Sequence, residues 1–243
     1  MKKLVIALII TLLFINGCGK KEMKVRVVVD PTFIPMEFRE NKELTGFDIE
    51  LIKMIGVNQN LKLIFVEKPW IKLLDTLKKG EADLAISAIT ITAERTETFS
   101  FSNPYLKGGQ ILVIRKDNPD IIMIIKDMAG KKVGVQEGTT GAIALKSYKK
   151  VIPVEFPEIE AAFSSLISNE VSGVVVDWPI ASNYVNFNDQ FKGKLKIIGA
   201  PITSERLGIA VNPDNHELLK RVNNGINFLK KNRKIEKLIK KWL

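Results

Sequence analysis

Short β-branched runs alternate with segments of helical apolar spacing along most of this chain, and this alternation constrains its fold more than any other feature. Residues 25–29 are β-branched apart from Arg26, and residues 47–55 have helical spacing. Further strands are predicted over 61–66, 111–115, 132–136, 154–156, 173–177, 195–198 and 207–211, and further helices over 70–77, 121–128, 159–167, 180–185, 217–229 and 234–242. Alternating βα units of this kind predict parallel sheets with helices on both faces.

The apolar strand predicted at residues 84–86 ends in hydroxyl-bearing side chains and an arginine. Ser87 and Thr90 follow the run, and Thr92 is a good N-cap for a short helix that carries Arg95 in its first turn. A guanidinium forms two parallel charge-assisted hydrogen bonds to a carboxylate, and helix N-termini favour anions. The stretch therefore indicates a carboxylate-binding site, and the alternative is an ordinary βα turn with a surface arginine.

Residues 1–18 are predicted to be a signal peptide. Two lysines precede an apolar run over residues 4–15, which is too short for a comfortable membrane span, and the run is followed by Cys18, the only cysteine. This arrangement resembles a bacterial lipobox, which implies that Cys18 becomes the lipidated first residue and residues 19–24 form a tether. The alternatives are a cleaved signal without lipid and an uncleaved anchor. One cysteine excludes a disulfide within the chain.

Composition and motif content exclude several classes of function. The chain has 243 residues, enough for one large domain or two small ones. Its formal charge of +10 is spread along the sequence without aromatic–basic interleaving, so we expect no nucleic-acid partner. The only histidine, His216, lies far from the motifs, and the sequence has no metal-ligand spacing, nucleophile elbow or phosphate loop. We therefore expect no metal, no cofactor and no catalytic residue.

Three motifs, in order along the chain, resemble those of one known family. They are Asp-Pro-Thr-Phe-Ile-Pro-Met-Glu-Phe at 30–38 with Gly-Phe-Asp-Ile at 46–49, Ser-Ala-Ile-Thr-Ile-Thr-Ala-Glu-Arg at 87–95 with Phe-Ser-Phe-Ser-Asn-Pro-Tyr at 99–105, and Gly-Lys-Lys-Val-Gly-Val-Gln-Glu-Gly-Thr-Thr at 130–140. From about residue 24 onward, the chain resembles the extracellular solute-binding proteins that deliver amino acids to ABC transporters. Within them it is similar to family 3, of the polar amino acid type, in lipoprotein form.

The resemblance implies a two-lobed α/β fold of the periplasmic-binding-protein type (type II), in which each lobe is a mostly parallel sheet flanked by helices. It places chain crossings near 107–109 and 202–206. Residues 24–108 and 204–243 would then form the first lobe and residues 109–203 the second. Ligands of open α/β sheets bind at the carboxyl ends of strands, where the motifs lie, so we expect the site between the lobes.

The resemblance also implies which residues bind an amino acid. Ten are expected to line the site: Asp30, Phe33, Trp70, Ser87, Ala88, Thr90, Arg95, Gln136, Thr140 and Asp177. We expect Arg95, the hydroxyl and backbone of Thr90, and the backbone N–H groups at Thr140 to bind the carboxylate. Asp177 would bind the ammonium group, and its alternative role is a helix cap.

The remaining expected contacts concern the ligand's side chain. Phe33 and Trp70 would flank its aliphatic stem, with core packing as the alternative. Asp30 and Gln136 would face its far end, although an aspartate at position 30 also suits a turn. The charge of Asp30 would favour a lysine, arginine or amide side chain and repel an acidic one.

The function implied is that of an exported substrate-binding protein. It would capture a basic or polar L-amino acid of the arginine, lysine or glutamine type and deliver it to an ABC transporter permease. The protein would be monomeric, and it would be periplasmic or lipid-anchored to the outer face of the cytoplasmic membrane. Two alternatives use the same fold: a ligand-binding sensor subunit, and an enzyme resembling cyclohexadienyl dehydratase, for which Glu137 is the nominated acid.

Overall fold

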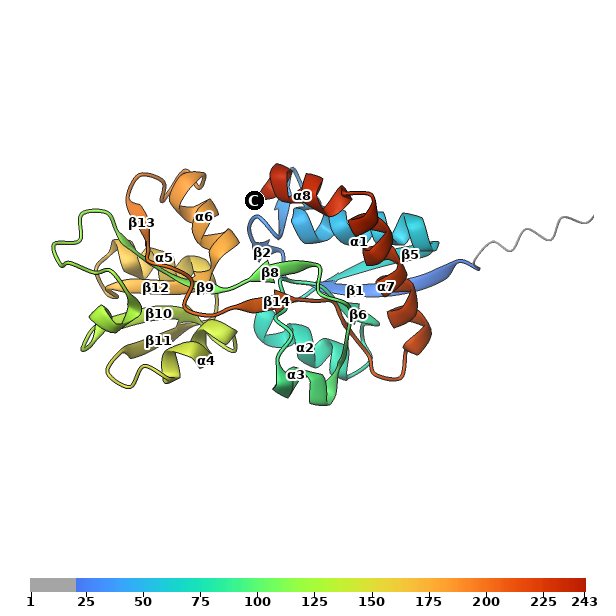
Figure 1. The fold of residues 1–243 in the computed structure, drawn as a ribbon, viewed down its shortest axis with the longest axis horizontal. Helices are drawn as coiled ribbons and strands as arrows, with labels where there is room; N and C mark the ends of the chain where they lie inside the picture. The colour runs from blue at the N-terminus through green and yellow to red at the C-terminus, as the bar shows by residue number, and fades with distance from the viewer. Residues whose placement is uncertain (1–20) are drawn as a thin grey trace, which may run out of the picture.

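Two five-stranded sheets organise residues 21–243, the part of the chain that the computed structural model describes. The first has the order β5 (Leu61–Glu67), β1 (Met23–Val29), β6 (Leu84–Ala85), β15 (Ala210–Val211), β7 (Ser100–Phe101). The second has the order β11 (Ile152–Phe156), β10 (Lys132–Gln136), β12 (Gly173–Asp177), β9 (Gln110–Arg115), β13 (Leu195–Ile198). The sheets occupy separate lobes that lie side by side (Figure 1).

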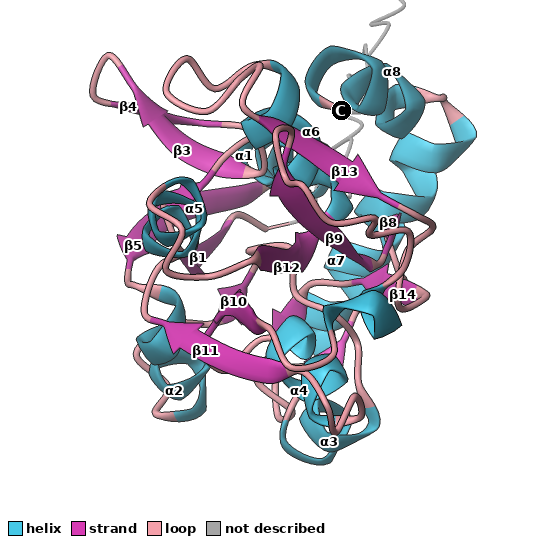
Figure 2. Ribbon diagram, turned by 90° about the vertical axis from the view of Figure 1, so that its left-hand side faces the viewer, coloured by secondary structure: helices cyan, strands magenta, loops and turns pink. Residues whose placement is uncertain are grey.

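Helices flank both sheets (Figures 1 and 2). The first lobe carries α1 (Phe47–Gln59), α2 (Trp70–Lys78), α3 (Ala93–Thr98), α7 (His216–Lys231) and α8 (Lys234–Trp242). The second carries the 3₁₀ helix η1 (Ile125–Met128), α4 (Thr140–Lys146), α5 (Ile159–Ile167) and α6 (Trp178–Asn186). A small three-stranded sheet of β2 (Thr32–Phe33), β3 (Glu37–Glu40) and β4 (Glu43–Thr45) extends the first lobe.

The central strands are buried on both faces, which explains their β-branched sequences. On β1, Val27 joins the apolar cluster that contains the buried side of α1, whereas its neighbour Val28 packs with α2. On β12, Val176 packs with α5 and α6, and Val175 faces α4. A strand covered by helices on both sides needs apolar side chains at consecutive positions rather than at alternate ones.

The two-lobed α/β fold is confirmed, and its sheets are mixed. In each sheet three neighbouring strands are parallel (β5, β1 and β6; β11, β10 and β12), and the other two pairings are antiparallel. The antiparallel strands lie next to the crossings along the chain. β9 directly follows the outgoing crossing and β15 follows the return, so each of these two strands enters its sheet from the other lobe and its direction is not set by a helix crossover within that sheet.

Two short strands connect the lobes. β8 (Leu106–Gly108) and β14 (Glu205–Leu207) pair antiparallel between the two sheets, with Glu205 opposite Gly108 (Figure 1). The crossings approach each other so closely that a Cβ on Gly109 would lie 2.5 Å from the carbonyl oxygen of Thr203. Only glycine fits at this position without moving the backbone.

One helix prediction was wrong. Helix was expected over residues 121–128, but only Ile125–Met128 forms a short 3₁₀ helix. The carboxylate of Asp127 accepts hydrogen bonds from the backbone N–H groups of Met123 and Ile124, at 2.9 and 3.0 Å. Such local side-chain bonds compete with the helical pattern.

The structure describes the C-terminal end of the chain but not residues 1–20. The predicted signal peptide and Cys18 lie outside the described residues. Within residues 21–243, no helix has the length and apolar content needed to cross a membrane. The C-terminal helix α8 packs against α1 and α7 and buries Ile235 and Leu238.

Candidate functional site

A cavity lies between the two lobes, and its empty space, including the part open to solvent, is about 340 Å³. Its lining residues are Asp30, Phe33, Trp70, Ser87, Ala88, Thr90, Arg95, Gln136, Thr139, Thr140 and Asp177. The structure therefore brings all the expected site residues around one space, and Thr139 is the one that the sequence reasoning missed. The N-cap signal at this position could have found it, because the Thr139 hydroxyl accepts from the N–H of Ala142 at the start of α4.

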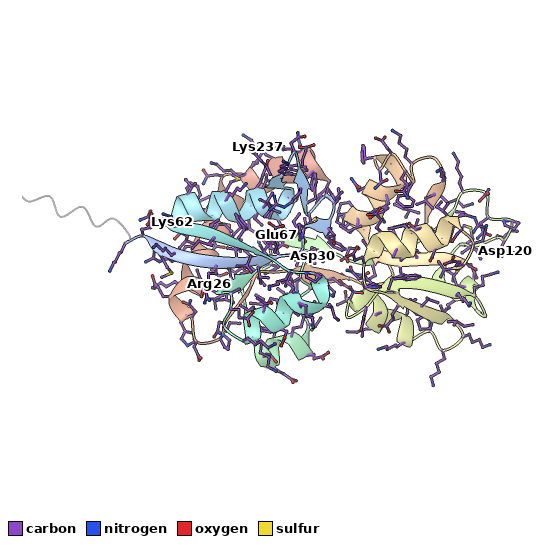
Figure 3. All side chains as sticks on the ribbon, turned by 180° about the vertical axis from the view of Figure 1, so that it is seen from behind. Arg26, Asp30, Lys62, Glu67, Asp120 and Lys237 are labelled. Carbon is purple, nitrogen blue, oxygen red and sulfur yellow. The ribbon has the colours of Figure 1, made fainter. Side chains whose placement is uncertain are left out.

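The cavity lies at the carboxyl ends of the parallel strands. Asp30 follows β1 and Ser87 follows β6 in the first lobe, while Gln136 and Asp177 end β10 and β12 in the second. Figure 3 shows Asp30 near the junction of the lobes, with Lys62 and Asp120 toward the two outer ends of the molecule. Parallel strands end at the same edge of their sheet, so side chains distant in sequence converge there.

Arg95 is fixed by contacts to both lobes. The predicted cap is confirmed, because the Thr92 hydroxyl accepts from the backbone N–H of Arg95 at 3.1 Å. The guanidinium donates to the carbonyl oxygens of Thr90, at 3.0 Å, and Gly138, at 3.4 Å. It also lies over the Trp70 ring, 5.2 Å from the centroid. The guanidinium has further N–H donors, which remain for a carboxylate in the cavity.

Asp177 does not act as a cap, which was the alternative role for this residue. It occupies the N-cap position of α6, yet its side chain makes no capping hydrogen bond. Among the described residues, its Oδ1 is one of the few buried side-chain atoms without a hydrogen-bond partner. Burial, then the negative charge of Glu205, raises the pKa of Asp177 to about 7, against the opposing effects of the Gln110 side chain and, to a smaller extent, of Arg95. A buried acceptor left unpaired costs about 1–3 kcal/mol, so this oxygen favours a bound donor.

Asp30 combines a cavity position with a structural role. Its Oδ1 accepts from the backbone N–H and the hydroxyl of Thr32, at 3.1 and 2.7 Å. Its Oδ2 accepts from the backbone N–H of Trp70 at 2.8 Å, at the start of α2. The carboxylate therefore holds the turn after β1 while it contributes a negative charge to the cavity.

The other expected residues also have protein partners. Phe33 lines the cavity and belongs to the main apolar cluster, so it serves both roles considered for it. The Gln136 side-chain nitrogen donates to the carbonyl oxygen of Pro157 at 3.2 Å, and the Ser87 hydroxyl donates to Glu37. Glu137 is exposed and is not among the lining residues.

Sequence reasoning missed a polar network directly behind the cavity. The Thr90 hydroxyl lies 2.6 Å and the Thr140 hydroxyl 3.0 Å from Oε2 of Glu205. A carboxylate accepts only, so the Thr90 hydroxyl directs its hydrogen at Glu205 rather than at the cavity. The expected contact of this hydroxyl with a ligand carboxylate stays a prediction. The Gln110 amide nitrogen lies 3.1 Å from the Thr140 hydroxyl. The only signal in the sequence was that Gln110 and Glu205 are polar residues beside the crossings.

Two buried carboxyl groups, those of Asp48 and Glu37, accept hydrogen bonds from Ala88 and Ser87, which line the cavity. Asp48 Oδ2 accepts from the backbone N–H of Ala88, at 2.7 Å, and from the hydroxyl of Tyr105, at 2.9 Å. Glu37 accepts from Ser87, and both carboxyl groups are fully buried. Burial, then the negative charge of Asp48, raises the pKa of Glu37 well above its usual range, and burial raises the pKa of Asp48 to about 7.

Stability is therefore expected to fall as pH rises. Both carboxyls bind protons more tightly in the folded than in the unfolded chain, where their pKa values are about 4. The free energy of unfolding then decreases by up to about 1.4 kcal/mol per pH unit per group, from about pH 4 through the pKa of Asp48. Glu37→Gln removes one of these groups and keeps its shape.

Thermal unfolding followed by circular dichroism from about pH 5 to pH 8 measures the effect. The decrease in melting temperature should be smaller in Glu37→Gln than in the wild type. Glu67→Gln, which alters a carboxylate paired with Arg39 outside the cavity, is the matched control and should keep the wild-type slope. If the melting temperature decreased equally with pH in all three proteins, the raised pKa of Glu37 would be contradicted.

Comparison with known proteins agrees with this geometry. The model of the family described as bacterial extracellular solute-binding proteins, family 3, matches residues 25–243. ABC transporter arginine-binding protein 1 of Escherichia coli (strain K12) is 29% identical over 245 residues, which cover 100% of this chain and 99% of that protein.

Solved structures are similar over most of the chain. An ancestral arginine-binding protein bound to arginine is 37% identical, with a TM-score of 0.84, over 90% of this chain and 98% of that one. An ancestral arginine-binding protein bound to glutamine gives 36% identity and a TM-score of 0.84, over 90% and 97%. A mutant of ArgBP from T. maritima gives 35% and 0.83, over 90% and 94%. Since the family model matches nearly the whole described chain, the protein belongs to the bacterial extracellular solute-binding proteins, family 3.

Proposed function

We propose that this protein captures a basic or polar L-amino acid, of the arginine, lysine or glutamine type, and delivers it to the permease of an ABC transporter. One observation carries the proposal. The guanidinium of Arg95 and the unpartnered buried oxygen of Asp177 line the same cavity. A zwitterion presents a carboxylate and an ammonium group, and each needs an opposite charge or a hydrogen-bond partner once water is excluded.

The charge of the cavity supports a basic or amide side chain. With Arg95 and Asp177 assigned to the ligand's main chain, Asp30 adds a negative charge that the lining residues do not balance. A cationic side chain gains from this charge, and a carboxylate side chain is repelled by it. The arginine-binding and glutamine-bound relatives are consistent with this preference.

Identification of the co-purified ligand tests the proposal. The purified protein is denatured, and the released small molecules are identified by mass spectrometry. The refolded protein is then titrated by calorimetry with L-arginine, L-lysine, L-glutamine and L-glutamate. We expect one of the first three to bind most tightly and L-glutamate to bind weakest. A native ligand that is acidic, apolar or not an amino acid would contradict the proposal.

We infer that the protein binds and does not convert its ligand. The relatives above are named as binding proteins. Glu137, the nominated acid for a dehydratase, is exposed outside the cavity lining. Incubation with a cyclohexadienyl acid should therefore leave that compound unchanged.

We also infer that the protein is exported and anchored by lipid at Cys18. The apolar run over residues 4–15 and the position of Cys18 after it support this inference. Cys18→Ser should leave the folded domain intact and move the protein from the membrane fraction to the soluble fraction of an exporting host, as seen by immunoblotting. A wild-type protein found entirely in the soluble fraction would exclude the lipid anchor.

A further inference from the structure

Glu205 connects the two lobes through one carboxylate. It is the first residue of β14, in the return crossing, and it is buried behind the cavity rather than lining it. Its Oε2 accepts from Thr90 of the first lobe, at 2.6 Å, and from Thr140 of the second, at 3.0 Å. Its Oε1 accepts from the hydroxyl of Thr203, at 2.8 Å, on the same crossing.

The direction of these hydrogen bonds follows from chemistry. A carboxylate has no hydrogen to donate, so each threonine hydroxyl must direct its single hydrogen at Glu205. Only the hydroxyl lone pairs then remain for other partners. The Thr140 oxygen uses one of them to accept from the amide of Gln110, at 3.1 Å.

Thr90 and Thr140 both line the cavity, so their remaining lone pairs are acceptors beside the site. The buried oxygen of Asp177 is a further acceptor there. Together with the oxygen of Asp177, these lone pairs suit a ligand group with several N–H donors. Arg95 supplies the donors for the ligand's carboxylate.

We propose that Glu205 is a positioning residue, which makes the Thr90 and Thr140 hydroxyls accept hydrogen bonds from the ligand's ammonium group. The inference rests on the amino-acid binding proposed above. It assigns the orientation of the bound zwitterion to a residue that does not touch the ligand. Because the two threonines belong to different lobes, the same carboxylate oxygen also favours the closed arrangement.

Glu205→Met tests the inference. The thioether side chain has a similar length but lacks both acceptor oxygens, so the threonine hydroxyls lose the group that holds their hydrogens and become free to donate toward the cavity. The probes are L-arginine and 5-guanidinopentanoate, which differ only in the α-amino group. We expect L-arginine affinity to fall by about 10- to 100-fold and the affinity of the desamino analogue to change by less than about threefold.

Three further single variants and one double variant complete the calorimetric comparison. Arg206→Gln changes one charge at an exposed position of the same strand, and should leave both affinities unchanged. Thr90→Val should reduce L-arginine binding selectively, whereas Thr90→Ser, which keeps the hydroxyl, should bind like the wild type. If Glu205 acts through Thr90, adding Glu205→Met to Thr90→Val should cost less than Glu205→Met costs alone.

Each outcome separates this inference from the proposed function. An equal loss of affinity for both probes would show that Glu205 only stabilises the structure around the cavity. An unchanged affinity for both would show that Glu205 has no part in binding. If Glu205→Met does not fold, the Thr90→Val and Thr90→Ser pair decides by the same selectivity. If the wild type does not bind L-arginine but binds L-glutamine, L-glutamine and its desamino analogue replace the probes. A wild type that binds no amino acid overturns the proposed function itself.

Discussion

Arg95→Ala is expected to weaken amino-acid binding by about two to four orders of magnitude. Hydrogen bonds to charged partners contribute about 1.5–3 kcal/mol each, and the substitution removes two of them, at about 1.4 kcal/mol per tenfold change. The loss should be similar for every amino acid that binds, because all of them share the carboxylate. Calorimetric titration of the variant with each ligand measures it.

The control for this prediction addresses the structural contacts of Arg95. The guanidinium also donates to the carbonyl oxygens of Thr90 and Gly138, so the melting temperature of the ligand-free variant must be compared with that of the wild type. Arg39→Ala, which removes an arginine paired with Glu67 elsewhere in the first lobe, should leave affinity unchanged. An Arg95→Ala affinity within threefold of the wild type would show that the carboxylate binds elsewhere.

Ligand affinity is expected to depend strongly on pH through Asp177. In the free protein, burial raises the pKa of this carboxyl to about 7. The ammonium group pairs with the ionised form, so binding below that pKa must release a proton. The dissociation constant should therefore increase by about 50-fold between pH 7 and pH 5, approaching tenfold for each pH unit well below 7, because only the ionised fraction binds.

Asp177→Asn provides the matched comparison. It keeps the shape of the side chain and removes the titrating group, so affinity should be weak at every pH and nearly constant from about pH 5 to pH 8. Calorimetry in two buffers of different ionisation enthalpy should show proton release on binding to the wild type at pH 6 and little release in the variant. A wild-type affinity that is flat over this range would contradict the role of Asp177.

Local sequence patterns determined those features that depend on residues close together in the chain. The Thr92 cap places its hydroxyl on the N–H of Arg95 three residues later, which is a contact within one helical turn. The consecutive apolar positions of β1 and β12 predicted strands covered on both faces. The residues that line the cavity were found through resemblance to a family, because no local rule brings Asp30 close to Asp177.

Local patterns failed where a distant or competing partner sets the conformation. Asp177 has the position and chemistry of a helix cap, but its side chain makes no capping bond. The apolar run over 121–128 has helical spacing, yet Asp127 binds the backbone of residues 123 and 124 and confines the helix to its end. The strands beside the crossings pair antiparallel, since no crossover helix sets their direction.

The direction of the hydroxyl groups in the cavity was decided only by the tertiary structure. Thr90 and Glu205 are separated by 115 positions in the sequence and meet at 2.6 Å because the chain crosses between the lobes twice. By itself, the sequence indicated most of the strands and helices and a cation suited to a carboxylate, whereas Asp177 was assigned to the ammonium group through the family resemblance. Whether a given hydroxyl donates or accepts depends on the group packed behind it, and that group is brought there by folding alone.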